Sequence, residues 1–132
     1  MVWTGSKLRE QRKFLRSVPM SQNHNQTSLS PAVLANSPDG WVILDVRKPI
    51  TRLASGSAIA GSVWRHPFDA LNWAGEFSGG RVAVYCVHGH EVSRAVRGFL
   101  ADMDIEAVIV EGGFEAWKAA GLPVAPVESA DV

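Results

Sequence analysis

The chain has 132 residues, of which 46% are hydrophobic and 20% are charged, and this composition is typical of one soluble globular domain. Its net charge of zero gives no reason to expect a nucleic-acid or membrane partner, and no apolar run is long enough to span a membrane. The single cysteine, Cys86, excludes an internal disulfide and suits a reducing compartment, so we expect a cytoplasmic protein.

Residues 1–28 differ from the rest of the chain in charge. Through Ser30, five basic residues are balanced by one acidic residue, which gives +4, whereas the remainder carries −4. No secretory apolar stretch is present. We interpret residues 1–28 as a flexible or partly helical tail, with a transit peptide, an anionic-surface contact or a translation start at Met20 as alternatives. A domain at 29–125 and a C-terminal tail at 126–132 follow.

The first elements of the domain are a short helix and a strand. Ser30 as N-cap and Pro31 at the first helical position predict a helix that stops at the turn cluster 36–40. The continuous apolar run 41–45 predicts a strand buried on both faces of a parallel sheet.

Asp45 and Arg47 lie at the C-terminal end of this strand, where α/β sheets place their ligand sites. We favour a hydrogen-bonded brace for this pair over a direct chemical role. Farther along, residues 62–65 predict a second strand, and residues 67–73 predict a helix. Arg65, at the end of the second strand, is either a substrate-anion ligand or a solvated surface charge.

The most informative stretch is the segment 82–100. A β-branched run ends at Cys86, a tight loop containing Gly89 follows, and apolar residues then recur at helical spacing. This arrangement places a side chain and several backbone N–H groups at a helix N-terminus. A thiolate or a persulfide anion is favoured there.

Cys86 has two simpler interpretations. A lone cysteine at a strand end often only fills the core. A zinc site with His88 and His90 is disfavoured because no remote ligand pair accompanies them, so we expect no metal and no cofactor. The two histidines either assist the sulfur with a hydrogen bond or partial charge, or are exposed loop residues. Ser93 is a candidate cap for the following helix.

The chain ends with another strand and helix. Residues 107–110 predict a strand, Gly112 and Gly113 permit a sharp turn, and residues 114–120 predict a helix closed by Gly121. Strands that alternate with helices throughout indicate an α/β fold with a mostly parallel sheet covered on both sides.

Four segments in order resemble the rhodanese family of sulfurtransferases: 42–47 (Val-Ile-Leu-Asp-Val-Arg), 59–62 (Ile-Ala-Gly-Ser), the loop that follows Cys86, and 108–117 with 121–124. The resemblance implies a rhodanese-like three-layer domain with a central sheet of about five strands flanked by helices. It also implies that Cys86 is the catalytic nucleophile, within an active-site loop of Val87, His88, Gly89, His90, Glu91 and Val92. We expect supporting roles for Asp45, Arg47, Arg65, Ser93 and Arg94.

The implied activity is transfer of sulfane sulfur from thiosulfate or a persulfide to a thiol or cyanide, through a persulfide on Cys86. The expected partners are a small sulfur donor and a thiol or protein acceptor, in a monomer or homodimer. The alternative is a non-catalytic rhodanese-like module for binding or stress sensing.

Two positions depart from related loops. Many sulfurtransferases have an arginine five positions after the cysteine, where this chain has Glu91. A carboxylate there opposes thiolate formation and repels thiosulfate, although Arg94 could partly offset it. Phosphatase-like relatives have an arginine six positions after the cysteine, where Val92 stands, so a phosphate-sized oxyanion would lack its bidentate partner.

Overall fold

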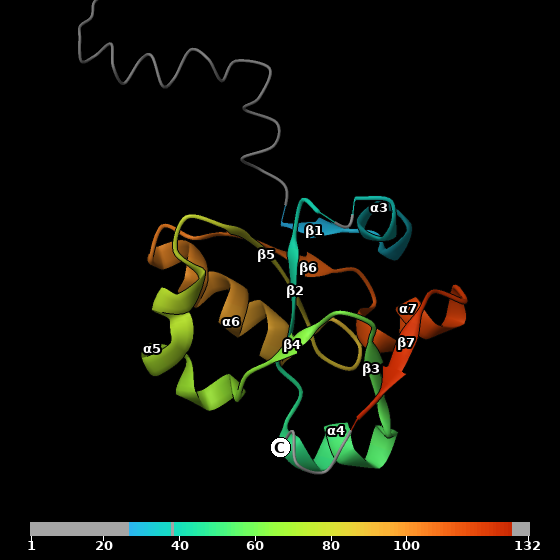
Figure 1. The fold of residues 1–132 in the computed structure, drawn as a ribbon. Helices are drawn as coiled ribbons and strands as arrows, with labels where there is room; N and C mark the ends of the chain where they lie inside the picture. The colour runs from blue at the N-terminus through green and yellow to red at the C-terminus, as the bar shows by residue number, and fades with distance from the viewer. Residues whose placement is uncertain (1–26, 38, 128–132) are drawn as a thin grey trace, which may run out of the picture.

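The structure is a computed structural model that describes residues 27–37 and 39–127 (Figure 1). The tail predicted for residues 1–28 falls outside these residues except for its last two positions. The elements, in chain order, are β1 (Ser28–Leu29), α3 (Pro31–Ala35), β2 (Val42–Asp45), α4 (Pro49–Ser55), β3 (Ser57–Ile59), β4 (Val63–Trp64), η1 (Pro67–Asp69), α5 (Ala70–Trp73), η2 (Ala74–Phe77), β5 (Arg81–Tyr85), α6 (Glu91–Asp102), β6 (Glu106–Val110), α7 (Gly113–Ala119) and β7 (Val124–Pro126).

Five of the strands form a parallel sheet in the order β1-β6-β5-β2-β4. A separate antiparallel pair joins β3 to β7, far apart in the sequence. The predicted α/β fold with a central sheet of about five strands is confirmed. The strands β1, β3 and β7 were not predicted, because two or three residues are too few to show a period.

The sheet lies between two layers of helices, as Figure 1 shows with α5 and α6 on one side and α3 and α7 on the other. Val82 and Val84 of β5 pack into one core cluster, with Val96 and Leu100 of α6. Alternate residues of the same strand, Ala83 and Tyr85, join the second cluster with residues of α3 and α7: Leu34, Phe114 and Trp117. Burial on both faces explains why β5 is a continuous apolar run and not an alternating one.

Local signals set the ends of several elements. The Ser30 hydroxyl accepts a hydrogen bond from the Val33 N–H, so α3 begins at the predicted cap. After α7, Gly121 adopts a positive φ of 73°, the left-handed conformation expected just past a helix end. Within the described ranges, none of the helices combines the length and apolar character needed to cross a membrane.

The position of the site follows from the sheet topology. The connection after β2 leads to β4 on one side, whereas the connection after β5 leads to β6 on the other. Chain segments therefore diverge between β2 and β5, and the carboxyl ends of the two strands are level because Asp45 pairs with Tyr85. Such a divergence point opens a crevice at the carboxyl edge of an α/β sheet.

Candidate active site

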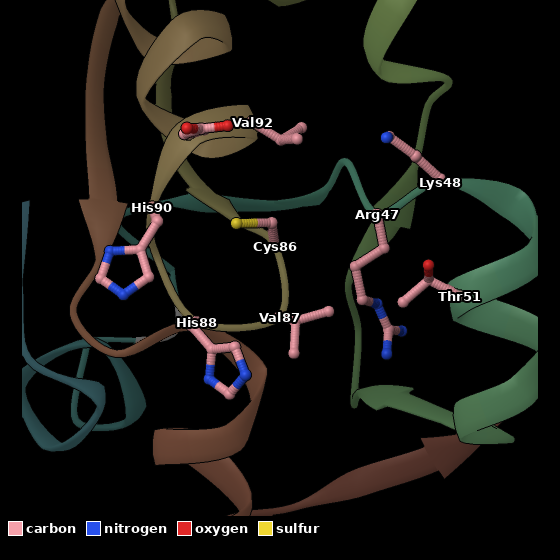
Figure 2. Close-up of a pocket in the computed structure, with 9 residues that line it drawn as sticks. Arg47, Lys48, Thr51, Cys86, Val87, His88, His90 and Val92 are labelled. Carbon is pink, nitrogen blue, oxygen red and sulfur yellow. The ribbon is translucent and has the colours of Figure 1, made fainter.

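Cys86 is the first residue after β5, at this carboxyl edge. Its residue surface is 8% exposed, so it is nearly buried but still lines a cavity. In Figure 2 the loop that carries Val87, His88 and His90 curls around the Cys86 sulfur before the chain enters α6. The sulfur is thus held at the start of a 12-residue helix, where N–H groups have no helical partner.

The sulfur of Cys86 has several hydrogen-bonding neighbours. Its Sγ lies 3.3 Å from the Ser93 hydroxyl oxygen, and the backbone N–H groups of Ser93, Gly89 and His90 also act on it. Burial of the thiol acts to raise the pKa of Cys86, but these hydrogen bonds favour the thiolate. Together they lower the pKa of Cys86 below its ordinary value.

Ser93 is not the helix cap predicted from the sequence. The N-cap of α6 is His90, which makes no side-chain capping bond, and Ser93 is the third residue of the helix. Its hydroxyl, fully buried, lies between the Cys86 sulfur and the carbonyl oxygen of His90, at 3.3 Å from each. The prediction failed because the hydroxyl of a serine in the first helical turn can donate to a preceding carbonyl oxygen and accept from a tertiary neighbour, and neither bond caps a free N–H group.

The loop is anchored from behind by α7. The N–H groups of Phe114 and Glu115 donate to the carbonyl oxygens of Cys86 and Val87, at 2.9 and 3.1 Å. A Cβ on Gly113 would lie 2.6 Å from both of these carbonyl oxygens, so only glycine permits the approach. Because the carbonyls of Cys86 and Val87 bond to α7, the later N–H groups of the loop are left to face the sulfur.

A cavity of about 490 Å³ opens over Cys86. Figure 2 shows that the loop forms one side of it and that the segment leading into α4 forms the other. Its lining residues are Arg47, Lys48, Thr51, Cys86, Val87, His88, His90, Glu91 and Val92. All the residues predicted for the active-site loop line this cavity except Gly89, which supplies backbone.

Asp45 and Arg47 form the predicted brace. The Asp45 carboxylate accepts two bonds from the Arg47 guanidinium, at 3.0 and 2.8 Å, and one from Arg52 at 3.0 Å, and all three residues are buried. Arg47 also donates to the Ser57 carbonyl oxygen at 2.9 Å, which ties β2 to β3. The remaining nitrogen, Nη1, has no hydrogen-bond partner, but the guanidinium lies 4.5 Å from the ring centroid of Phe114.

The two loop histidines are exposed, and in Figure 2 their rings point away from the Cys86 sulfur. Their ring centroids are 6.3 Å apart. In the part of the chain that the structure describes, no three His, Cys, Asp or Glu side chains are placed to hold a metal ion. The side chains of His88 and His90 therefore lie at the exposed part of the cavity lining, whereas Cys86 is nearly buried.

Of the predicted supporting residues, only Arg47 lines the cavity. The side chains of Asp45 and Ser93 bond to the lining residues Arg47 and Cys86, whereas those of Arg65 and Arg94 do not reach the cavity. Arg65 was expected near the mouth of the loop, but its guanidinium pairs with Glu76 at 2.7 Å on the surface. Arg94 is exposed, one turn into α6. Neither arginine is brought to the sulfur, because the strand end at Arg65 faces η2 and the helix turns Arg94 outward.

Lys48 and Thr51 are cavity residues that the sequence interpretation missed. They lie in the stretch least similar to rhodaneses, so no motif marked them. The available signal was position, since Lys48 follows the carboxyl end of β2, the strand beside β5.

Comparison with known proteins agrees with this geometry. The family model for the rhodanese-like domain matches residues 30–120. Comparison with curated proteins gives no match.

Several solved structures are similar to this chain in fold, at low sequence identity. A rhodanese-related protein from Thermoplasma volcanium is 29% identical with a TM-score of 0.67, and the match covers 75% of this chain and 97% of that one. A thiosulfate sulfurtransferase from Pseudomonas aeruginosa is 25% identical with a TM-score of 0.64, covering 80% of this chain but 20% of that one. A protein of unknown function from Rhodopseudomonas palustris, described as a possible tyrosine phosphatase, is 26% identical with a TM-score of 0.65, covering 78% and 87%.

Proposed function

We propose that this chain, which belongs to the rhodanese-like domain family, is a sulfurtransferase that carries sulfane sulfur as a persulfide on Cys86. The observation that carries the proposal is the set of hydrogen bonds that favour a thiolate on the one cysteine, at the base of a cavity. Likeness to a thiosulfate sulfurtransferase supports it.

In the loading step, the Cys86 thiolate attacks the sulfane sulfur of a donor. A bond forms between Sγ and that sulfur, and the bond between the sulfur and the rest of the donor breaks. The electron pair leaves with sulfite if the donor is thiosulfate, or with a thiolate if the donor is a persulfide. The N–H groups that surround Cys86 are placed to stabilise the charge of the attacking sulfur.

In the discharge step, a thiolate or cyanide acceptor attacks the outer sulfur of the persulfide. The bond between the two sulfurs breaks, and Cys86 leaves as a thiolate. The hydrogen bonds that lower the pKa of Cys86 also make it a better leaving group. The same groups therefore serve both halves of the cycle.

Glu91 shapes the choice of donor. This carboxylate lines the cavity, where many related loops carry arginine. It repels a dianion such as thiosulfate, so we propose a persulfide as the better donor.

The test is the intact mass of the purified protein before and after incubation with inorganic polysulfide. Gain of about 32 Da, the mass of one sulfur atom, is expected, with loss of the adduct on reduction and none in Cys86→Ser. If neither polysulfide nor thiosulfate adds sulfur, the sulfurtransferase proposal fails. The retained fold with Glu91 at the cavity would then favour a non-catalytic rhodanese-like module.

A further inference from the structure

Two opposite charges without ion-pair partners lie at the cavity of Cys86. Lys48 and Glu91 both line it, and both are exposed. Among the described residues, the ion pairs join Arg47 and Arg52 to Asp45, Arg65 to Glu76, and Lys118 to Glu115. Neither Lys48 nor Glu91 takes part in any of them, so both are available to charged groups of a ligand.

The two charges belong to different sides of the cavity. Lys48 precedes α4, and Figure 2 shows its side chain extending over the cavity from the side opposite the loop. The Lys48 ammonium lies 5.6 Å from the ring centroid of Phe68, a neutral neighbour that does not cancel its charge. Glu91 is the first residue of α6, on the loop side. Cys86 lines the same cavity as both charges.

The cavity is also larger than an inorganic donor requires. Its volume of about 490 Å³ falls within the range of roughly 300–1,000 Å³ typical of sites for small organic molecules. Val87 and Val92 give it an apolar wall suited to methylene groups. Arg47 also lines the cavity, but its charge is paired with Asp45. A cavity with one cation and one anion outside these ion pairs, and with an apolar wall, fits an organic zwitterion better than a small oxyanion.

We infer that the thiol that exchanges sulfur with Cys86 is a small zwitterion, an amino-acid-like or short peptide thiol with one carboxylate and one ammonium group. Lys48 binds the carboxylate and Glu91 binds the ammonium group, which directs the thiol sulfur toward Cys86. The inference rests on the proposed sulfurtransferase function and specifies its substrate class.

The chemical step is balanced for such a thiol. Its thiolate forms a bond to the outer sulfur of the Cys86 persulfide, the bond between the outer sulfur and Sγ breaks, and Cys86 receives the electron pair. The products are the persulfide of the small thiol and a free Cys86 thiolate. No external oxidant or reductant is needed.

The test uses four acceptor thiols that differ in charge: free cysteine (both groups), 3-mercaptopropionate (carboxylate), cysteamine (ammonium) and 2-mercaptoethanol (neutral). Cys86 is first loaded with inorganic polysulfide, and kcat/KM for discharge is measured for each thiol. Each variant is compared with the wild type for the same thiol, which cancels the intrinsic reactivity of the thiol. The variants are Lys48→Gln and Glu91→Gln, with Lys118→Gln and Glu106→Gln as charge-matched controls outside the cavity.

Lys48→Gln should lower kcat/KM about two- to fivefold for the two carboxylate thiols relative to 2-mercaptoethanol, the size expected for an exposed ion pair. Glu91→Gln should do the same for the two ammonium thiols, and the controls should change no ratio. Changes that are uniform across the four thiols, or absent, would overturn the inference.

The experiment distinguishes failure of the zwitterion inference from failure of the sulfurtransferase proposal. If polysulfide loads Cys86 but the charge ratios do not change, the sulfurtransferase function stands and the zwitterion inference falls. If Cys86 does not load, binding of unreactive S-methylcysteine is followed by NMR of the loop amides. Saturable binding weakened by both cavity variants would still support the zwitterion site, and no binding would overturn it.

Discussion

The Cys86 sulfur and the hydroxyl oxygen of Ser93 lie 3.3 Å apart, and Ser93 also places its backbone N–H toward the same sulfur. In the thiol state, Cys86 donates to Ser93, and Ser93 donates to the His90 carbonyl oxygen at 3.3 Å. In the thiolate state, the Ser93 hydroxyl can turn and donate to sulfur instead. One buried serine thus stabilises both protonation states of the nucleophile.

Ser93→Ala should raise the pKa of Cys86, because the side-chain hydrogen bond is the largest of the effects that lower it. The rate of alkylation by iodoacetamide, measured against pH, should therefore shift to higher pH. Ser78→Ala, which changes an exposed serine outside the cavity, should leave the profile unchanged. An unshifted profile in Ser93→Ala would show that the hydroxyl does not stabilise the thiolate.

The lowered pKa of Cys86 should also make stability depend on pH. The unfolded thiol has an ordinary pKa of about 8.5, so between the folded and unfolded values the folded protein binds fewer protons than the unfolded chain. This contribution is fully present above the unfolded pKa and is lost as the pH falls through the folded pKa.

The free energy of unfolding of the wild type relative to Cys86→Ala should accordingly increase from pH 6 toward pH 8.5, as measured with urea at several pH values. The difference between the two proteins isolates Cys86 from the other titrating groups. A difference that stays constant or decreases with pH would contradict a lowered pKa.

Gly113→Ala should distort the active-site loop. The added methyl group would lie 2.6 Å from the carbonyl oxygens of Cys86 and Val87, and the residue has a positive φ of 64°. Loss of persulfide formation and a destabilisation of about 1–3 kcal/mol are expected from the clash and the strain.

Gly121→Ala is the matched control for this variant. Its φ of 73° is similar, but nothing lies within 4 Å of the added methyl group, so only the conformational cost of about 1–2 kcal/mol applies. Persulfide formation should be retained. Equal loss of persulfide formation in both variants would show that the close contact between α7 and the loop is not required for persulfide formation on Cys86.

Asp45→Asn should be among the most destabilising single changes. It leaves two buried arginines, Arg47 and Arg52, without the carboxylate they share, at an expected cost of about 3–5 kcal/mol. Glu76→Gln breaks the exposed pair with Arg65 and should cost at most about 1 kcal/mol. Urea denaturation of the two variants measures the contrast, and similar costs would refute the bracing role.

Glu91→Arg should increase the rate at which thiosulfate loads Cys86. Replacing the carboxylate removes a repulsive charge from the cavity, and roughly 1.4 kcal/mol of relief corresponds to about tenfold in rate. The measurement is the rate of adduct formation by intact mass, with polysulfide as the reference donor. A similar increase for Glu106→Arg would mean that overall charge, not charge in the cavity, is responsible.

Structural features that depend on a few neighbouring residues could be predicted from the sequence. The cap at Ser30, the buried strand before Cys86 and the turn at Gly112 depend on local geometry, and the structure has them. The pairing of β3 with β7 was not predictable, because its hydrogen bonds join segments far apart in the sequence.

The candidate site also combines features set by local sequence with features set by contacts between distant segments. The loop sequence placed Cys86 at a helix N-terminus, which is a local consequence of strand, turn and helix. The partner of Arg65, the bond of Ser93 and the presence of Lys48 at the cavity depend on how separate elements pack. Side chains that meet only in three dimensions leave no periodic signal in the sequence.

The anchoring of the loop carbonyls by α7 means that the reactive loop is not a portable unit. Residues 86–92 grafted onto another strand–helix junction would lack the N–H donors of Phe114 and Glu115. Their own carbonyls would then be free to turn toward the sulfur and oppose its negative charge. Engineering this chemistry into another scaffold requires two segments, the loop and the glycine turn that begins α7, to be transferred together.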